Sequence, residues 1–118
     1  MSSHTLIMTA LEAHAGLAAQ VGTRIRADLA KAEDDYPFVI FKRSDLDIGY
    51  HLDGSISYTY EEFEVECWGR SRSQAIDVFE QALGALHAAE LEPRRGQPDG
   101  IDPELLERVN VITVEVWS

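Results

Sequence analysis

The sequence predicts one α+β domain, in which an antiparallel sheet of about four strands is covered on one face by two helices. Apolar residues recur at helical spacing in two segments, and they alternate with polar residues at strand spacing in two others. The chain has 118 residues, of which 45% are hydrophobic, enough for the modest core of a single domain. We therefore treat residues 1–118 as one domain.

The first helix is expected over residues 5–20, where an apolar stripe recurs every three or four residues. Gly22 is expected to end it, because glycine adopts a left-handed backbone at little cost. A short extended segment (23–26) and a polar loop (27–36) should follow. The stripe comprises Leu6, Ile7, Ala10, Leu11, His14, Leu17 and Ala18, and the candidate N-caps are Ser2, Ser3 and Thr5.

Two strands joined by a long arm are expected next. Residues 38–43 are rich in aromatic and β-branched side chains, and residues 57–68 alternate strictly. In the second strand Phe63, Val65 and Cys67 point one way, and Glu62, Glu64 and Glu66 point the other. The segment between them, residues 46–56, contains the turn dipeptide Asp53-Gly54, which predicts an exposed hairpin arm with its tip there.

The second helix is expected to start at the capping-box pattern of Ser71 and Gln74 and to end near Ala89. Its predicted apolar face comprises Ile76, Phe79, Ala82, Leu83 and Leu86, with Ala75 and Val78 flanking it. Residues 92–102 hold two prolines and two glycines and predict an exposed, mobile loop that carries Arg94 and Arg95. A helical turn is expected to begin at 102–104.

The last strand is expected over residues 109–117, half buried, with Ile112, Val114 and Val116 alternating with Thr113, Glu115 and Trp117. One core should then unite two strands and the second helix. Its expected members are Phe63, Val65, Phe79, Leu83, Ile112 and Val114.

The formal net charge of -11 disfavours a general nucleic-acid or membrane binder, because such a surface repels phosphate and anionic lipid. An acidic wall beside passing DNA remains compatible with it. Cys67 is the only cysteine, which excludes an intrachain disulfide and a thiolate zinc cluster. No secretory signal or membrane-spanning run is visible, so we expect the protein in the cytosol.

No residue pattern indicates catalysis, a cofactor or a metal. The four histidines, His4, His14, His51 and His87, form no ligand pair, and no phosphate-binding loop or nucleophile elbow is present. The row of Glu62, Glu64 and Glu66 lacks a companion base, so we interpret it as a solvated or lumen-facing acidic strand face. Cys67 is interpreted as a small buried hydrophobic residue.

Trp68 and Trp117 are expected to face away from the packed side of their strands. Exposed tryptophans are enriched at protein interfaces, and packing at a sheet edge is the alternative. The candidate interface for subunits or partners comprises Asp47, Tyr50, His51, Asp53, Arg94, Arg95, Trp68 and Trp117.

The order of these elements resembles the phage and prophage tail-terminator, or tail-completion, family of head-to-tail joining proteins. The resemblance spans nearly the whole chain, and none of its motifs is a catalytic signature. It is carried by Leu17 to Gly22 with Arg24-Ile25, Tyr36 to Phe41, Asp53-Gly54, Val65 to Gly69, the helix from Ser73, and Val111 to Trp117.

This resemblance implies a structural virion protein, not an enzyme, that forms a ring, usually of six subunits. The ring caps the tail tube, stops its growth and joins the head, so the implied partners are the tail-tube protein and a head-completion or connector protein. DNA would pass through without specific binding. Another neck or head-completion component stays open as an alternative, as does a small-molecule-binding or enzymatic domain, which would need a pocket with convergent polar groups.

Overall fold

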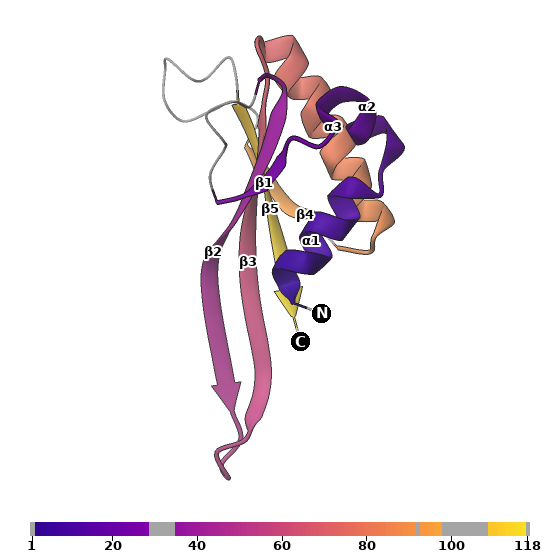
Figure 1. The fold of residues 1–118 in the computed structure, drawn as a ribbon. Coiled ribbons are helices and arrows are strands. Elements are labelled where there is room, and N and C mark those ends of the chain that lie inside the picture. Colours follow the sequence, from indigo (N-terminus) through magenta and orange to yellow (C-terminus); the bar gives the residue numbers. More distant parts are fainter. Residues whose placement is uncertain (1, 29–34, 92, 98–108, 118) are drawn as a thin grey trace.

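The computed structural model describes residues 2–28, 35–91, 93–97 and 109–117, with the backbone alone for residues 94–97. A five-stranded sheet with the order β1-β2-β3-β5-β4 carries helices on one face (Figure 1). The α+β prediction is confirmed, with three helices and five strands in this part of the chain. The elements are α1 (Ser3–Glu12), α2 (Ala15–Val21), β1 (Ile25–Ala27), β2 (Phe38–Tyr50), β3 (Ile56–Trp68), α3 (Arg72–Ala88), β4 (Pro93–Gln97) and β5 (Val109–Trp117).

The described sheet is antiparallel except at one edge. β2 pairs with β3, β3 with β5, and β5 with β4, all antiparallel. The short extended segment expected after the first helix is β1, and it lies parallel to β2, with Ile25 opposite Val39. A parallel pair of strands needs a crossover connection, which here is the chain between β1 and β2. Period-two alternation in the sequence does not show whether a strand pairs parallel or antiparallel with its neighbour.

The single helix expected over residues 5–20 is two helices. Ser2 caps α1 by accepting a hydrogen bond from the Thr5 amide at 3.1 Å, and Gly22 ends α2 with a φ of +58°, as predicted. Between them His14 has an extended backbone, and its Nε2 lies 3.0 Å from Gln81 Oε1 on α3. On either side of this break, α1 and α2 each contact α3.

The start and end of α3 match the sequence prediction, whereas its buried face matches only in part, at Ala82 and Leu86 and at the flanking Ala75 and Val78. Ser71 Oγ accepts from the Gln74 amide at 3.2 Å, and the helix closes at Ala89. Phe79 is only half buried against the core, and Leu83 is 37% exposed, so the prediction that Leu83 belongs to the core is wrong. Small residues let the helix lie close to the sheet. The buried face comprises Ala75, Val78, Ala82, Ala85 and Leu86.

The core lies between the sheet and the helices, and the alternation predicted for β3 is confirmed. Phe63, Val65 and Cys67 are fully buried on the helix-facing side. β5 departs from its predicted half-burial, because Val109, Val111 and Thr113 on its other face are buried as well. Its position between β3 and β4 gives β5 a central place in the sheet. The other sheet residues of the core are Val39, Phe41, Ile112, Val114 and Val116.

The loop predicted over residues 92–102 is wrong for Pro93–Gln97, which form β4 along the free edge of β5. Proline is compatible with the first position of an edge strand, because it has no amide hydrogen to donate to a ladder. A register shift between Pro93 and Arg95 fits this irregular edge. The rest of that prediction, the turn at 102–104 and most of the 27–36 loop lie outside the described residues.

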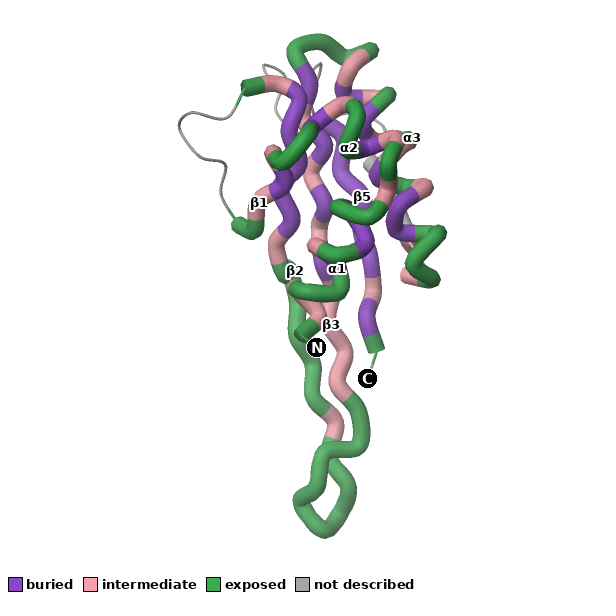
Figure 2. Tube along the Cα trace, turned by 45° about the vertical axis from the view of Figure 1, so that its right-hand side comes forward, coloured by how far each residue is buried: buried purple, intermediate pink, exposed green. Residues whose placement is uncertain are grey.

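The hairpin of β2 and β3 is much longer than the sheet that supports it, so its distal half projects as an arm (Figure 2). The molecule is accordingly elongated, with extents of 52 × 30 × 25 Å. We call residues 44–60 the arm. None of the described helices is both long and apolar enough to span a membrane.

Candidate interaction surfaces

The tip of the arm is held by its own hydrogen bonds. The His51 amide donates to the Ser55 carbonyl at 2.8 Å, and the Gly54 amide donates to the His51 carbonyl at 3.0 Å. Gly54 has a φ of +90°, which favours glycine, and Asp53 Oδ1 accepts from both the amide and the hydroxyl of Ser55. The Ser55 hydroxyl, and then its amide, lower the pKa of Asp53. The predicted tip at Asp53-Gly54 is confirmed.

The arm exposes more large apolar side chains than the rest of the described chain. Outside the arm, the large hydrophobic residues exposed in the described ranges are Leu6, Leu83 and Trp117. Clustered exposed apolar surface marks sites of protein interaction, whereas scattered residues do not. Within the arm the exposed residues are Leu46, Ile48, Tyr50, Leu52, Ile56 and Tyr58.

An aromatic cluster lies at the base of the arm, on the sheet face opposite the helices. Any Cβ at Gly49 would overlap the ring of Tyr58, so this glycine gives the ring room to lie across the neighbouring strand. Tyr58 donates to Asp47 Oδ2 at 3.2 Å, and Asp47 raises the pKa of Tyr58. The ring of Trp117 lies 5.9 Å from that of Tyr58 and 4.7 Å from that of Tyr60.

The row of Glu62, Glu64 and Glu66 lies on this same face, as the alternation predicted, and its residues are half buried. The Tyr60 hydroxyl lies 3.0 Å from Glu62 and 3.3 Å from Glu115, and its single proton can be donated to only one at a time. Partial burial, followed by Glu62 and Glu115, raises the pKa of Tyr60 to about 12.

Glu66 has partners within the chain. Lys42 Nζ lies 2.9 Å from Glu66 Oε2, and the Trp68 indole donates to Glu66 Oε1 at 3.0 Å. The hydrogen bond and charge of Glu66 raise the pKa of Lys42, which is partly exposed. The acidic face is therefore partly neutralised by a lysine of the adjacent strand.

The two tryptophans differ in environment. Trp68 is half buried and stacks on Phe38 with ring centroids 5.9 Å apart. Trp117 is 61% exposed at the base of the arm. Of the other candidate interface residues, Asp47, Tyr50, His51 and Asp53 are exposed on the arm, whereas Arg94 and Arg95 belong to β4, across the sheet from the arm.

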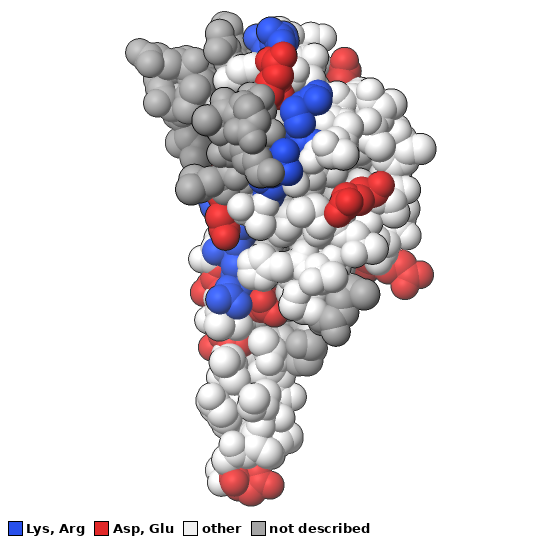
Figure 3. All heavy atoms as spheres, viewed as in Figure 1, with Lys and Arg blue, Asp and Glu red and all other residues white. Residues whose placement is uncertain are grey.

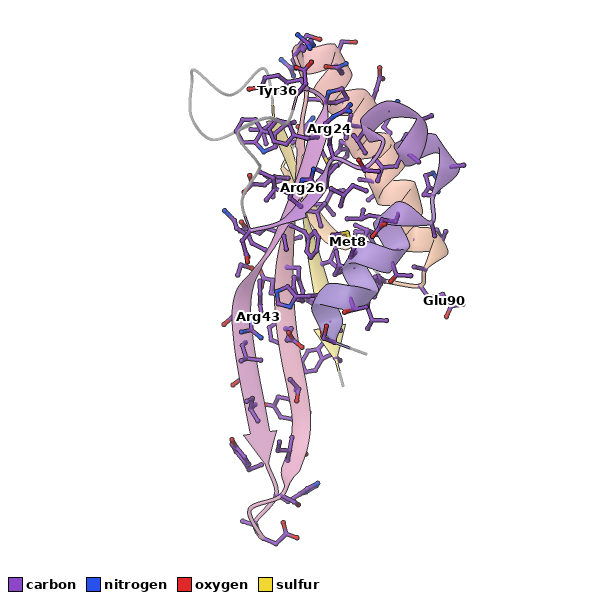
Figure 4. All side chains as sticks on the ribbon, viewed as in Figure 1. Met8, Arg24, Arg26, Tyr36, Arg43 and Glu90 are labelled. Atoms are coloured by element: carbon purple, nitrogen blue, oxygen red, sulfur yellow. The ribbon has the colours of Figure 1, made fainter. Side chains whose placement is uncertain are left out.

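The described cations lie away from the arm tip (Figure 3). They are found at β1, in the first half of β2 and at the start of α3. Arg24 donates to the backbone carbonyls of Pro37 and Gln20, at 3.0 and 3.4 Å. Figure 4 shows Arg24 and Arg26 beside the upper part of the sheet and Arg43 where the arm begins. These cations are Arg24, Arg26, Lys42, Arg43, Arg70 and Arg72.

The described residues hold no group of three His, Cys, Asp or Glu side chains placed to bind a metal ion. Cys67 is fully buried, and burial raises the pKa of its thiol, so the thiol stays protonated near neutral pH. Sequence reasoning missed the aromatic cluster. The matching alternation of Tyr58 and Tyr60 was a visible signal, but the place of Trp117 beside them depends on the pairing of β3 with β5.

An elongated α+β domain with a projecting hairpin and a partly exposed aromatic base is suited to contact with other proteins. The model of the family described as Tail completion protein gp17 matches residues 5–117. The chain belongs to this family, which confirms the resemblance found in the sequence.

A solved structure gives the same fold. The chain is similar to one from the "Virion of native gene transfer agent (GTA) particle", with a TM-score of 0.64 and 16% identity over 98% of this chain and 96% of that chain. At this identity the likeness establishes the fold. No curated protein matches the chain.

Proposed function

We propose that this chain is a tail-terminator protein, whose copies form a ring on the completed tail tube, with six subunits as the sequence resemblance implies. Membership in the tail-completion family makes it a structural protein of the phage tail. In the proposal the ring ends tail elongation and provides the surface to which the head is joined. The supporting observation is the arm, whose apolar side chains are exposed in the isolated chain.

The proposed partners are further copies of the chain, the tail-tube protein and a head-completion or connector protein. Assembly would take place in the host cytoplasm, and the finished position would be the junction of tail and neck in the virion. Similarity to a chain of a gene transfer agent virion supports this placement. We propose no catalytic activity, cofactor or membrane contact; the buried, protonated Cys67 fits a structural role.

The acidic face of Glu62, Glu64 and Glu66 has two proposed roles. Facing the channel, it would repel DNA phosphates and keep the genome from adhering during ejection. Facing a neighbour, it would pair with arginines across the interface. Replacing all three by glutamine separates these roles. If the glutamates face the channel, the variant should form intact rings that deliver DNA slowly. If they lie at an interface, assembly should fail or change its salt dependence. Normal assembly together with normal infectivity would eliminate both roles.

The proposal is tested by shortening the arm. Residues 49–58 are replaced by Asn-Gly, a two-residue hairpin turn that joins the paired residues Ile48 and Thr59, and the variant is supplied to a phage or prophage that lacks the gene. The shortened protein should stay folded and monomeric, and electron microscopy should show tails of irregular length without heads. If the shortened protein still forms rings and completes tails, the arm has no role in assembly.

Wild-type protein provides the direct measurement. Mass photometry and negative-stain microscopy should show a ring with an open centre, whereas a monomer at every concentration would overturn the proposal. Headless tails of normal length in the gene deletion would indicate a neck or head-completion protein instead.

A further inference from the structure

We infer that the arm of one copy docks on the cationic end of a second copy, so that the copies join head to tail. The cationic end is defined as Arg24, which precedes β1, with Arg70 and Arg72 at the start of α3. Figure 1 shows the start of α3 at the far end of the molecule from the arm tip, and Figure 4 shows Arg24 in the same upper part. The inference rests on the proposed ring, because it assigns the two surfaces through which the ring would assemble.

The arm has the composition of one half of such a contact. No Lys or Arg occurs between Ser44 and Gly69, and the carboxylates of the arm itself are Asp45, Asp47 and Asp53, all exposed. Exposed apolar side chains lie among them. Among the described residues, β1 pairs with the outer edge of β2 only as far as Phe41, and no described strand lies along the rest of that edge. An open strand edge offers backbone hydrogen bonds to a neighbouring chain.

The cationic end supplies the complementary charge. The described hydrogen bonds of Arg24 go to backbone carbonyls, which are neutral acceptors. Arg70 pairs with Asp35, but both side chains are more than 60% exposed, so the pair is weak and a neighbour's carboxylate can compete for it. Arg72 is exposed at the first turn of α3.

A second copy is the partner that fits this arrangement. The chain carries a net charge of -11, so copies repel one another on average, and association requires local pairing of opposite charges. Here the two complementary surfaces lie at opposite ends of a molecule 52 Å long. Different patches meeting on successive copies make a heterologous contact, which generates a closed ring when the rotation between copies closes.

Charge reversal on each surface tests the contact. The arm variant is Asp45→Arg with Asp47→Arg, and the end variant is Arg70→Glu with Arg72→Glu. An acidic residue in the first turn of α3 suits the helix dipole, so the end variant should fold. The matched control is Asp77→Arg with Glu80→Arg, which makes the same charge change as the arm variant on the exposed side of α3.

Each reversed variant alone should associate at least about tenfold more weakly than wild type, because like charges then meet at every contact. An equimolar mixture should assemble, since each arm then faces a surface of opposite charge. Its rings should contain even numbers of alternating copies, resolved by native mass spectrometry. The control should assemble as wild type does, and circular dichroism should show the same folded spectrum for all.

The outcomes separate the inference from the proposed function. If both reversed variants still form rings like those of the wild-type protein, the docking of the arm on the cationic end would be overturned, and the proposed ring would stand. If neither variant assembles alone and their equimolar mixture does not assemble either, the arm meets some other surface, and the docking on the cationic end would again be overturned. A wild-type protein that never assembles would overturn both.

Discussion

Leu86 and Leu83 give a direct test of how α3 is oriented. Leu86 is fully buried in the core, whereas Leu83 on the same helix is 37% exposed. The apolar stripe in the sequence places both residues on the packed face. Replacing each by alanine makes the same chemical change at positions that the structure distinguishes.

The expected costs follow from burial. Leucine to alanine removes three carbons, about 2.5 kcal/mol of transfer free energy when all are buried, and a residual cavity brings the cost to about 3 to 4 kcal/mol. Leu86→Ala should therefore lower the free energy of unfolding by this amount. Leu83→Ala leaves no closed cavity, because its site opens to solvent, and should cost about 1 kcal/mol.

Thermal unfolding followed by circular dichroism measures the difference. For a domain of this size, Leu86→Ala should lower the Tm by about 14 °C and Leu83→Ala by about 4 °C. Both variants belong in the arm-shortened background, so that assembly does not add to the stability of either. Helix propensity changes equally in the two and cancels. A larger loss for Leu83→Ala would refute the orientation of α3 described above.

Three further predictions concern single sites. Gly49→Ala should displace the Tyr58 ring and cost about 1 kcal/mol, a loss that should largely vanish in a Tyr58→Ala background; urea denaturation of the four proteins measures this coupling. Because the pKa of Tyr60 is raised from 10.0 to about 12, its contribution to stability is fully present below pH 10 and lost as the pH rises toward 12. Tyr60→Phe should therefore make the Tm fall less steeply over that range, and an unchanged slope would contradict the assignment. Buried Cys67 should react with a thiol reagent much more slowly in native protein than in guanidinium; equal rates would contradict its burial.

Local signals in the sequence were reliable where short-range chemistry decides the structure. The caps at Ser2 and Ser71, the end of α2 at Gly22 and the tip at Asp53-Gly54 depend on hydrogen bonds and backbone preferences within a few residues. The alternation in β3 likewise fixed which side chains face the core. These features need no knowledge of the rest of the chain.

The candidate surfaces were only partly predictable. The arm and the acidic row were visible because both follow from turn chemistry and alternation. The partners of that row were not, since Lys42 reaches Glu66 only through the pairing of β2 with β3. The stacking of Trp68 on Phe38 likewise requires two strands that are distant in sequence to lie side by side.

The sequence by itself determined the α+β class, the hairpin with its tip, the limits of α3 and the membership of the tail-completion family. Tertiary structure alone decided the break at His14, the parallel pairing of β1, the strand at Pro93–Gln97 and the burial of Ala85 in place of Leu83. Each of these depends on backbone pairing or close packing between segments far apart in the chain, and such contacts leave no periodic pattern in the segment itself.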